Sequence, residues 1–199
     1  MNNAEKLYRA GQSIWYDNIE RSLLDSGEFA RMVTDGEIFG VTSNPSIFNN
    51  AIGKSDTYDP AIAQLAGRAS ASDIFFALAV EDIQRAADAL RPVYDNTSRK
   101  DGYVSLEVDP FLAGDTARTI EQVQRIWQLV NRPNLMVKIP ATLAGIPAIE
   151  ASIAAGINVN ATLIFSLERY QQVMDAYLSG LRRRIAEGKP VEPIHSVAS

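Results

Sequence analysis

The sequence predicts an α/β fold, a (β/α)8 TIM-type barrel of which about six of the eight strands lie in this chain. Short apolar stretches alternate with helical patterns along the 199 residues, as they do in parallel α/β folds. No Gly-x-Gly-x-x-Gly or Gly-Lys-Ser/Thr pattern follows the first stretch, which argues against nucleotide binding. Polar residues recur on successive predicted strands, and a barrel would gather them at the carboxyl ends of its strands.

Composition excludes several functional classes. A content of 46% hydrophobic and 22% charged residues is ordinary for a globular domain. The net charge of -5 lacks the basic footprint of a nucleic-acid-binding protein. With no cysteine and only His195 as an imidazole, the chain has no disulfide or thiol chemistry, and a zinc site would need carboxylates. Without a long apolar segment or a signal peptide, we expect a cytoplasmic protein with no membrane partner.

The first predicted elements are short. A polar lead-in precedes a strand at 13–16, and Asp17 follows its carboxyl end. Apolar residues at helical spacing over 19–35 are interrupted by Gly27, so we expect two short helices there. Asp17 has two interpretations, a residue of the functional site or the N-cap of the next helix.

A second strand is predicted at 37–45, where Pro45 stops it. Thr42 and Asn44 form its polar end. The mixed composition of 46–67 predicts short helices and turns, an excursion between the main elements.

A long helix and a third strand follow. Ser72 is the expected N-cap of the helix, whose apolar stripe continues to Pro92. The strand at 103–108 alternates in polarity, with Ser105 and Glu107 on one face and apolar residues on the other.

Lys138 lies inside an apolar strand at 135–140, between helices predicted at 113–131 and 146–155. Leaving a lysine charged and unpaired among valine and isoleucine is costly, so desolvation favours the neutral amine. A neutral amine can attack a carbonyl and form a Schiff base. The alternative is a lysine whose stem packs in the sheet while its ammonium reaches solvent.

The fifth predicted strand, at 157–165, places Asn158, Asn160 and Thr162 on one face. These side chains suit either a functional site or the satisfaction of hydrogen bonds inside a barrel.

The last elements are a helix capped by Ser166 and a sixth strand at 193–199. His195 in that strand is interpreted as a core or loop histidine, and 182–184 as a solvated, arginine-rich helix end. The expected buried stripe of the helix consists of Tyr170, Val173, Met174, Tyr177 and Leu181.

Two segments resemble the signature stretches of the transaldolases, Gly-Val-Thr-Ser-Asn-Pro-Ser-Ile-Phe at 40–48 and Leu-Met-Val-Lys-Ile-Pro-Ala-Thr-Leu-Ala-Gly at 135–145. Glu107 in Leu-Glu-Val-Asp-Pro and the run at 158–166 also resemble that family, so the resemblance covers nearly the whole chain. It implies a metal-free class I barrel without a cofactor. Such an enzyme transfers a dihydroxyacetone unit from sedoheptulose 7-phosphate to glyceraldehyde 3-phosphate, in the pentose phosphate pathway.

The resemblance also implies roles for single residues. Lys138 would be the Schiff-base lysine, and Asp17 the acid–base group that handles the hydroxyl proton during carbon–carbon cleavage. Glu107 and Thr162 would position and activate the catalytic water. Substrate would be held by Thr42, Asn44, Asn160 and Ser199.

The chain departs from the family in its length. Barrels of this type have about 250 residues and eight strands, and the family's phosphate-binding arginine lies a few residues beyond the position of Ser199. We therefore expect residues 1–199 to be a single barrel domain that is incomplete at its carboxyl end. Some members of that family are fused to a phosphoglucose isomerase domain, and the sequence leaves open whether this protein has one.

Two alternatives stand beside a transaldolase: a small Schiff-base fructose 6-phosphate aldolase on the same barrel, or a catalytically inactive fragment. A partial barrel would expose the edges of its first and last strands. We therefore expect little activity from the chain alone, and association into a homo-oligomer or with a carboxyl-terminal fragment.

Overall fold

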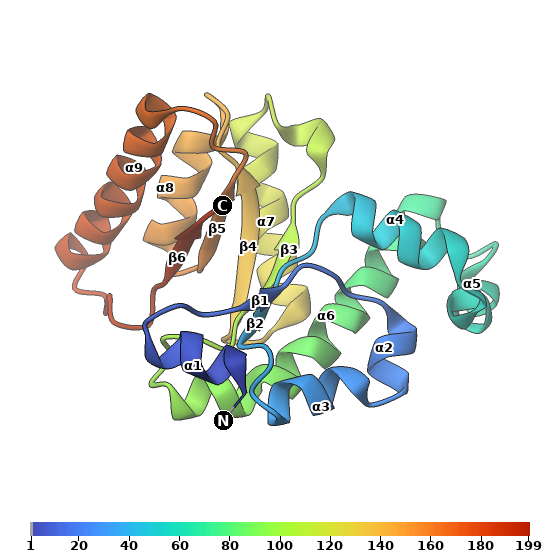
Figure 1. Cartoon of the computed structure of the whole chain (residues 1–199). Helices are drawn as coiled ribbons and strands as arrows, with labels where there is room; N and C mark the ends of the chain where they lie inside the picture. Colours follow the sequence, from blue (N-terminus) through green and yellow to red (C-terminus); the bar gives the residue numbers. More distant parts are fainter. Residues whose placement is uncertain (1) are drawn as a thin grey trace. The chain divides into compact units, whose positions relative to one another are not determined.

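The computed structural model describes residues 2–199, which form two compact units. Unit 1 runs to Val104 and includes Val130–Asn134, and unit 2 comprises Ser105–Leu129 and Leu135–Ser199. Figure 1 colours both units along the sequence.

The described residues form six parallel strands that neighbour one another in sequence order. Consecutive strands are joined by helical segments, and the order never reverses as it does in a doubly wound sheet. The predicted α/β fold class and the number of strands are thus confirmed. The strands are β1 Trp15–Tyr16, β2 Gly40–Val41, β3 Val104–Glu107, β4 Leu135–Pro140, β5 Val159–Thr162 and β6 Ser196–Ala198.

Unit 1 contains the short helices that the sequence predicts. Gly27, at a φ of 76°, separates two of them, because a left-handed conformation strains residues that carry a Cβ. The excursion after β2 is helical, as expected. In order, the helices are α1 Asn3–Arg9, α2 Arg21–Asp25, α3 Glu28–Thr34, α4 Pro45–Lys54, the 3-10 turn Asp56–Tyr58, α5 Asp59–Leu65 and α6 Ala71–Asn96.

The boundaries of α6 differ from the prediction. Its N-cap is Ser70 and not Ser72, since the Ser70 hydroxyl accepts a hydrogen bond from the Asp73 amide at 3.1 Å. The helix also continues through Pro92, although proline removes one backbone donor. Leu90 and Tyr94 are buried on either side of Pro92, so tertiary packing holds this turn in the helix.

Unit 2 contains the 3-10 turn Pro110–Leu112, most of α7 Thr116–Val130, and the helices α8 Gly145–Ala155 and α9 Leu167–Ala186. Ser166 caps α9 as predicted, because its hydroxyl accepts a hydrogen bond from the Arg169 amide at 3.1 Å.

The buried face of α9 differs from the predicted stripe. Val173 is buried as expected, but Tyr170 is 42% exposed, and Ala176 and Gly180 are buried instead. A Cβ on Gly180 would lie 2.7 Å from Cβ of Ile153, so the small residues permit a close approach between α9 and α8. These two helices lie side by side in Figure 1.

Arg184 also differs from the prediction of a solvated helix end, because it is only 7% exposed. Its Nε donates to the Pro190 carbonyl at 2.9 Å, and its Nη1 donates to the Ala154 carbonyl at 3.2 Å. The second bond satisfies a carbonyl in the last turn of α8, which has no partner within its own helix.

Across residues 2–199, none of the helices combines the length and apolar character needed to cross a bilayer.

Candidate active site

Lys138 lies in the middle of β4, a strand in which every residue is buried. Its side chain is 10% exposed, and its Nζ lies 3.9 Å from Oε2 of Glu107. Nine-tenths of the side chain is thus shielded from solvent, which argues against the alternative interpretation of this lysine. A buried amine beside a carboxylate is an arrangement suited to carbonyl chemistry.

Glu107 is the last residue of β3, and the Val108 amide donates to the Lys138 carbonyl at 3.0 Å, which sets the register beside β4. Burial raises the pKa of Glu107, and the nearby charge of Lys138 offsets part of this increase. A carboxyl group with a raised pKa can exchange protons at a higher pH than an exposed glutamate.

Two further candidates lie on β5, where Asn160 pairs in register with Lys138 and Thr162 pairs with Pro140. Both side chains are buried. The Asn160 Nδ2 donates to the Ser105 hydroxyl on β3 at 3.0 Å. Because β4 lies between β3 and β5, this hydrogen bond passes over β4 on the face that carries Glu107.

Ser199 joins the same group. Its hydroxyl donates to Oδ1 of Asn160 at 2.8 Å, and its amide donates to the Ala161 carbonyl at 2.8 Å. Ser105, Asn160 and Ser199 therefore form a continuous hydrogen-bonded chain. Ser105 was not among the predicted site residues, although its place two positions before Glu107 on the same strand face would have identified it.

Asn158 has a different environment from Asn160. Its Nδ2 donates to the Leu135 carbonyl at 3.2 Å, and its Oδ1 accepts from the His195 amide at 2.9 Å. These two hydrogen bonds to backbone groups hold together β4, the start of β5 and the segment before β6. Asn158, which immediately precedes β5, thus has a structural role.

The turn after β4 explains the residues that follow Lys138. The Thr142 hydroxyl donates to the Ala113 carbonyl at 2.6 Å and accepts from the Gly145 amide at 2.9 Å. A Cβ at Gly145 would overlap the Pro140 carbonyl oxygen. Position 145 therefore requires glycine so that α8 can start directly beside the end of the lysine strand.

The remaining candidates belong to unit 1, where each follows the carboxyl end of a strand. Asp17 is exposed after β1 and does not cap α2, whose N-cap is Glu20. Thr42 and Asn44 follow β2, and the Asn44 Oδ1 accepts from the Ile47 amide at 2.9 Å, which caps α4. Asn44 thus caps α4 through its side-chain oxygen.

A buried ionic cluster in unit 1 was not predicted. The Arg21 Nε donates to Asp82 at 3.0 Å, and the Tyr58 hydroxyl donates to the other oxygen of Asp82 at 2.8 Å. The Arg21 amide also donates to the Tyr58 hydroxyl at 2.9 Å. This cluster fixes the start of α2, four residues after Asp17, against α6 and the 3-10 turn Asp56–Tyr58.

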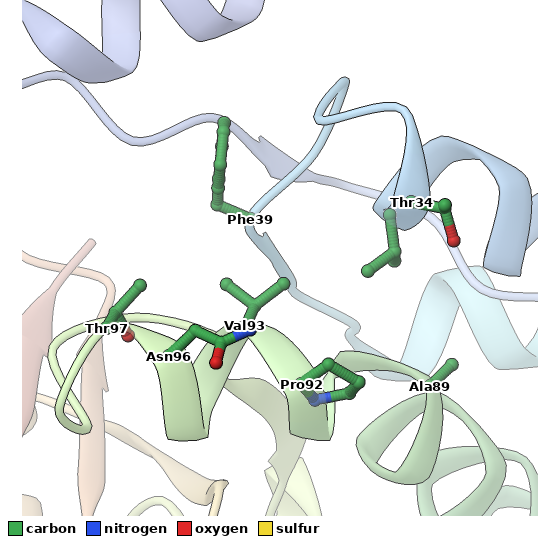
Figure 2. A pocket seen from close by; sticks show the side chains of 8 residues that line it. Thr34, Phe39, Ala89, Pro92, Val93, Asn96 and Thr97 are labelled. Carbon is green, nitrogen blue, oxygen red and sulfur yellow. The ribbon is translucent and has the colours of Figure 1, made fainter.

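Unit 1 also contains a surface pocket of about 360 Å³, shown in Figure 2. Phe39 lines it and immediately precedes β2, so the pocket lies at the amino end of this strand. Because parallel α/β enzymes place their chemistry at the carboxyl ends, this pocket is not the candidate active site. Its lining consists of Val33, Thr34, Phe39, Ala89, Pro92, Val93, Asn96 and Thr97.

Comparison with known proteins adds independent information. Residues 14–199 match the family described as Transaldolase/Fructose-6-phosphate aldolase. The transaldolase of Thermobifida fusca is 50% identical over 196 residues, which are 98% of this chain and 53% of the relative. Transaldolase 1 of Streptomyces avermitilis is 50% identical over 198 residues, 99% of this chain and 52% of the relative. The transaldolase of Mycobacterium tuberculosis is 46% identical over 198 residues, which are 99% of this chain and 53% of the relative. The chain thus spans about half the length of the curated relatives it matches.

Proposed function

The chain belongs to the transaldolase/fructose-6-phosphate aldolase family, and from this premise we propose that Lys138 forms a Schiff base with the carbonyl of a phosphorylated ketose. One observation carries the proposal: Lys138 is buried within β4 with its Nζ 3.9 Å from the Glu107 carboxylate. The proposed reaction is the transfer of a dihydroxyacetone unit from sedoheptulose 7-phosphate to glyceraldehyde 3-phosphate, in the cytoplasmic pentose phosphate pathway.

The reaction begins when the neutral Lys138 amine attacks the ketose carbonyl. Loss of water from the carbinolamine gives an imine, which draws electrons from the neighbouring carbon. Asp17 then accepts the proton of the hydroxyl group as the carbon–carbon bond breaks, and the bonding electron pair forms an enamine. The aldehyde product leaves, and the enamine carbon attacks the acceptor aldehyde, whose oxygen takes the proton back from Asp17. Hydrolysis of the new imine then frees Lys138.

Glu107 is proposed to move protons to and from the water that leaves the carbinolamine and later returns. Its raised pKa supports this role, because the group must be protonated in one step and ionised in the other. Thr162 on β5, which pairs in register with Pro140 of β4, would hold the same water. The hydrogen-bonded chain of Ser105, Asn160 and Ser199 supports a further role in holding substrate hydroxyls, which Thr42 and Asn44 would share.

A second candidate function is the simple cleavage of fructose 6-phosphate, which the family description also names. We favour transfer because the relatives at 46% to 50% identity are named transaldolases. A chimera separates the two, with the 199 residues replacing the matched segment of the Thermobifida fusca relative. We expect sugar transfer to erythrose 4-phosphate in a coupled assay. Release of free dihydroxyacetone without transfer would favour the aldolase, and a folded chimera without either activity would contradict both.

Glu107→Gln in this chimera is expected to lower the transfer rate by about two to four orders of magnitude, because the variant cannot exchange protons with water. The pH profile gives a second readout. Ionisation of Glu107 is required for its action as a base, so the rate should rise with pH through a pKa above 4.5, the ordinary value for glutamate. This step should disappear in the variant.

The matched control is Glu121→Gln, which changes an exposed glutamate of α7. It should leave unchanged both the transfer rate and the rise of this rate with pH. A loss of rate below about fivefold in Glu107→Gln, or a rise with pH that persists in this variant, would mean that Glu107 is structural.

A further inference from the structure

The loop that carries Asp17 is short, and hydrogen bonds hold it at both of its ends. At its start, the Thr42 amide donates to the Tyr16 carbonyl at 2.9 Å, which ties the loop to the residue that follows β2. At its end, the Arg21 amide donates to the Tyr58 hydroxyl at 2.9 Å. The backbone is therefore anchored on both sides of the exposed Asp17.

The hydroxyl that accepts from the Arg21 amide is itself held in one orientation. Tyr58 is 0% exposed, and its hydroxyl donates to Oδ2 of Asp82 at 2.8 Å. Burial raises the pKa of Tyr58, so the hydroxyl keeps its proton for Asp82 while a lone pair accepts from the amide. The Arg21 guanidinium lies 4.8 Å from the centroid of the Tyr58 ring and donates to the other oxygen of Asp82 at 3.0 Å. Both the ring and the hydroxyl are thus fixed.

Tyr58 belongs to the helical excursion after β2, a segment to which the proposed chemistry gives no role of its own. The excursion begins at Asn44, which caps α4, and it returns to the start of α2 at the 3-10 turn Asp56–Tyr58. Ala51 and Leu78 join Tyr58 in one buried apolar cluster, which holds this turn in place. The excursion therefore links the loop after β1 with the loop after β2, and both loops carry candidate site residues.

A purely structural role is the alternative interpretation of this cluster. A buried ion pair is often no more stabilising than apolar residues of similar volume, because removing two charges from water is costly. Its directional hydrogen bonds, by contrast, fix one position of the backbone. Here that position is the Arg21 amide, at the end of the Asp17 loop. Proton transfer needs such control, since displacing a reacting group by about 1 Å can lower a rate about a hundredfold.

We propose that Tyr58 is a positioning residue, whose hydroxyl holds the Asp17 carboxylate in place for proton transfer during carbon–carbon cleavage. Arg21 and Asp82 keep the Tyr58 hydroxyl in its orientation. This inference rests on the proposed function, in which the proton of the ketose hydroxyl goes to Asp17 and the bonding electron pair goes to the enamine. Imine formation on Lys138 comes before this step and does not depend on it.

Tyr58→Phe in the chimera with the Thermobifida fusca relative removes only this hydroxyl. We expect kcat for transfer to fall by about ten- to a hundredfold, because the Asp17 loop loses one of its two anchors. The KM for fructose 6-phosphate should stay within about twofold. The matched control is Tyr103→Phe, because Tyr103 is 1% exposed and its hydroxyl donates to the Arg99 carbonyl at 2.6 Å. The thermal midpoint should fall in both variants, but only Tyr58→Phe should lower kcat.

The mass of the adduct trapped by sodium borohydride distinguishes imine formation from cleavage. With fructose 6-phosphate, cleavage leaves a three-carbon unit on Lys138, whereas an uncleaved imine carries the whole sugar phosphate. The unmutated chimera and Tyr103→Phe should give mainly the three-carbon adduct when a coupling enzyme consumes the released glyceraldehyde 3-phosphate. Tyr58→Phe should label Lys138 to the same extent but shift the adduct to the uncleaved mass. Asp17→Asn should show the same shift, and adding Tyr58→Phe to it should lower kcat no further.

Arg21→Lys is a second, independent variant, because it keeps a cation beside Asp82 but loses the planar group that lies over the Tyr58 ring. We expect the same shift in adduct mass with a smaller loss of kcat.

Two outcomes would overturn the positioning role. The first is a Tyr58→Phe variant whose kcat and adduct mass match those of Tyr103→Phe. The second is an equal loss of kcat from Tyr58→Phe with and without Asp17→Asn, which would mean that the hydroxyl acts independently of Asp17. An unmutated chimera in which Lys138 is not labelled would instead overturn the proposed function, and this inference with it.

Discussion

Lys138→Ala is expected to abolish sugar transfer by the chimera while leaving its thermal midpoint nearly unchanged. The amine is the proposed covalent nucleophile, so no neighbouring group can replace it. Its removal leaves Glu107 without a cation at 3.9 Å, but this carboxyl already has a raised pKa and can become neutral. Lys138→Met, which keeps most of the side-chain volume, should behave in the same way.

Chemical trapping tests the same role on the 199-residue chain itself. Fructose 6-phosphate with sodium borohydride should add the mass of the reduced adduct to the peptide that contains Lys138. Lys189→Ala, at a lysine that pairs with Glu187 on the surface, should still be labelled at residue 138. A variant without Lys138 that retains transfer at an unchanged midpoint, or labelling elsewhere, would remove the proposed Schiff-base role.

Arg21→Met is expected to lower the free energy of unfolding by about 3 to 5 kcal/mol, because it leaves a buried carboxylate without its cation. Asp82 is 0% exposed and accepts from both Arg21 and Tyr58. The destabilisation should shrink as the pH falls, since protonation of Asp82 in the variant removes the uncompensated charge. Urea unfolding at several pH values measures both effects.

Arg85→Met is the matched control, because Arg85 forms an exposed ion pair with Asp25 at 2.6 Å. Loss of such a surface pair should change the stability by about 1 kcal/mol or less. Equal losses in the two variants would show that burial of the Arg21 cluster adds nothing to its stability.

Local sequence patterns were sufficient for much of the fold. Gly27 separates two helices because its backbone adopts a left-handed conformation there. Ser166 starts α9 because its hydroxyl caps the first turn. The alternation of β3 placed Ser105 and Glu107 on one face of that strand. Each of these features depends on residues only a few positions apart.

Packing between distant segments decided most of the features that were missed. The N-cap of α6 is an exception, because Ser70 forms it through a local hydrogen bond from the Asp73 amide. Pro92, by contrast, stays inside that helix because its neighbours are buried. The face of α9 that meets α8 follows Gly180, whose lack of a Cβ matters only beside Ile153. Hydrophobicity alone predicts that the large apolar side chains of α9 are the buried ones. The close approach of α9 to α8 instead buries its small residues.

The sequence alone determined the fold class, the succession of strands and helices along the chain and the single lysine in an apolar strand, because alternation and helical periodicity are local properties of the chain. Only the tertiary structure decided that Asn160 reaches Ser105, that Arg184 is buried and that Arg21, Tyr58 and Asp82 form one cluster. The partners in these contacts lie between 6 and 61 positions apart. No local pattern specifies such pairs, because a polar side chain is equally compatible with water until folding brings its partner within hydrogen-bonding distance.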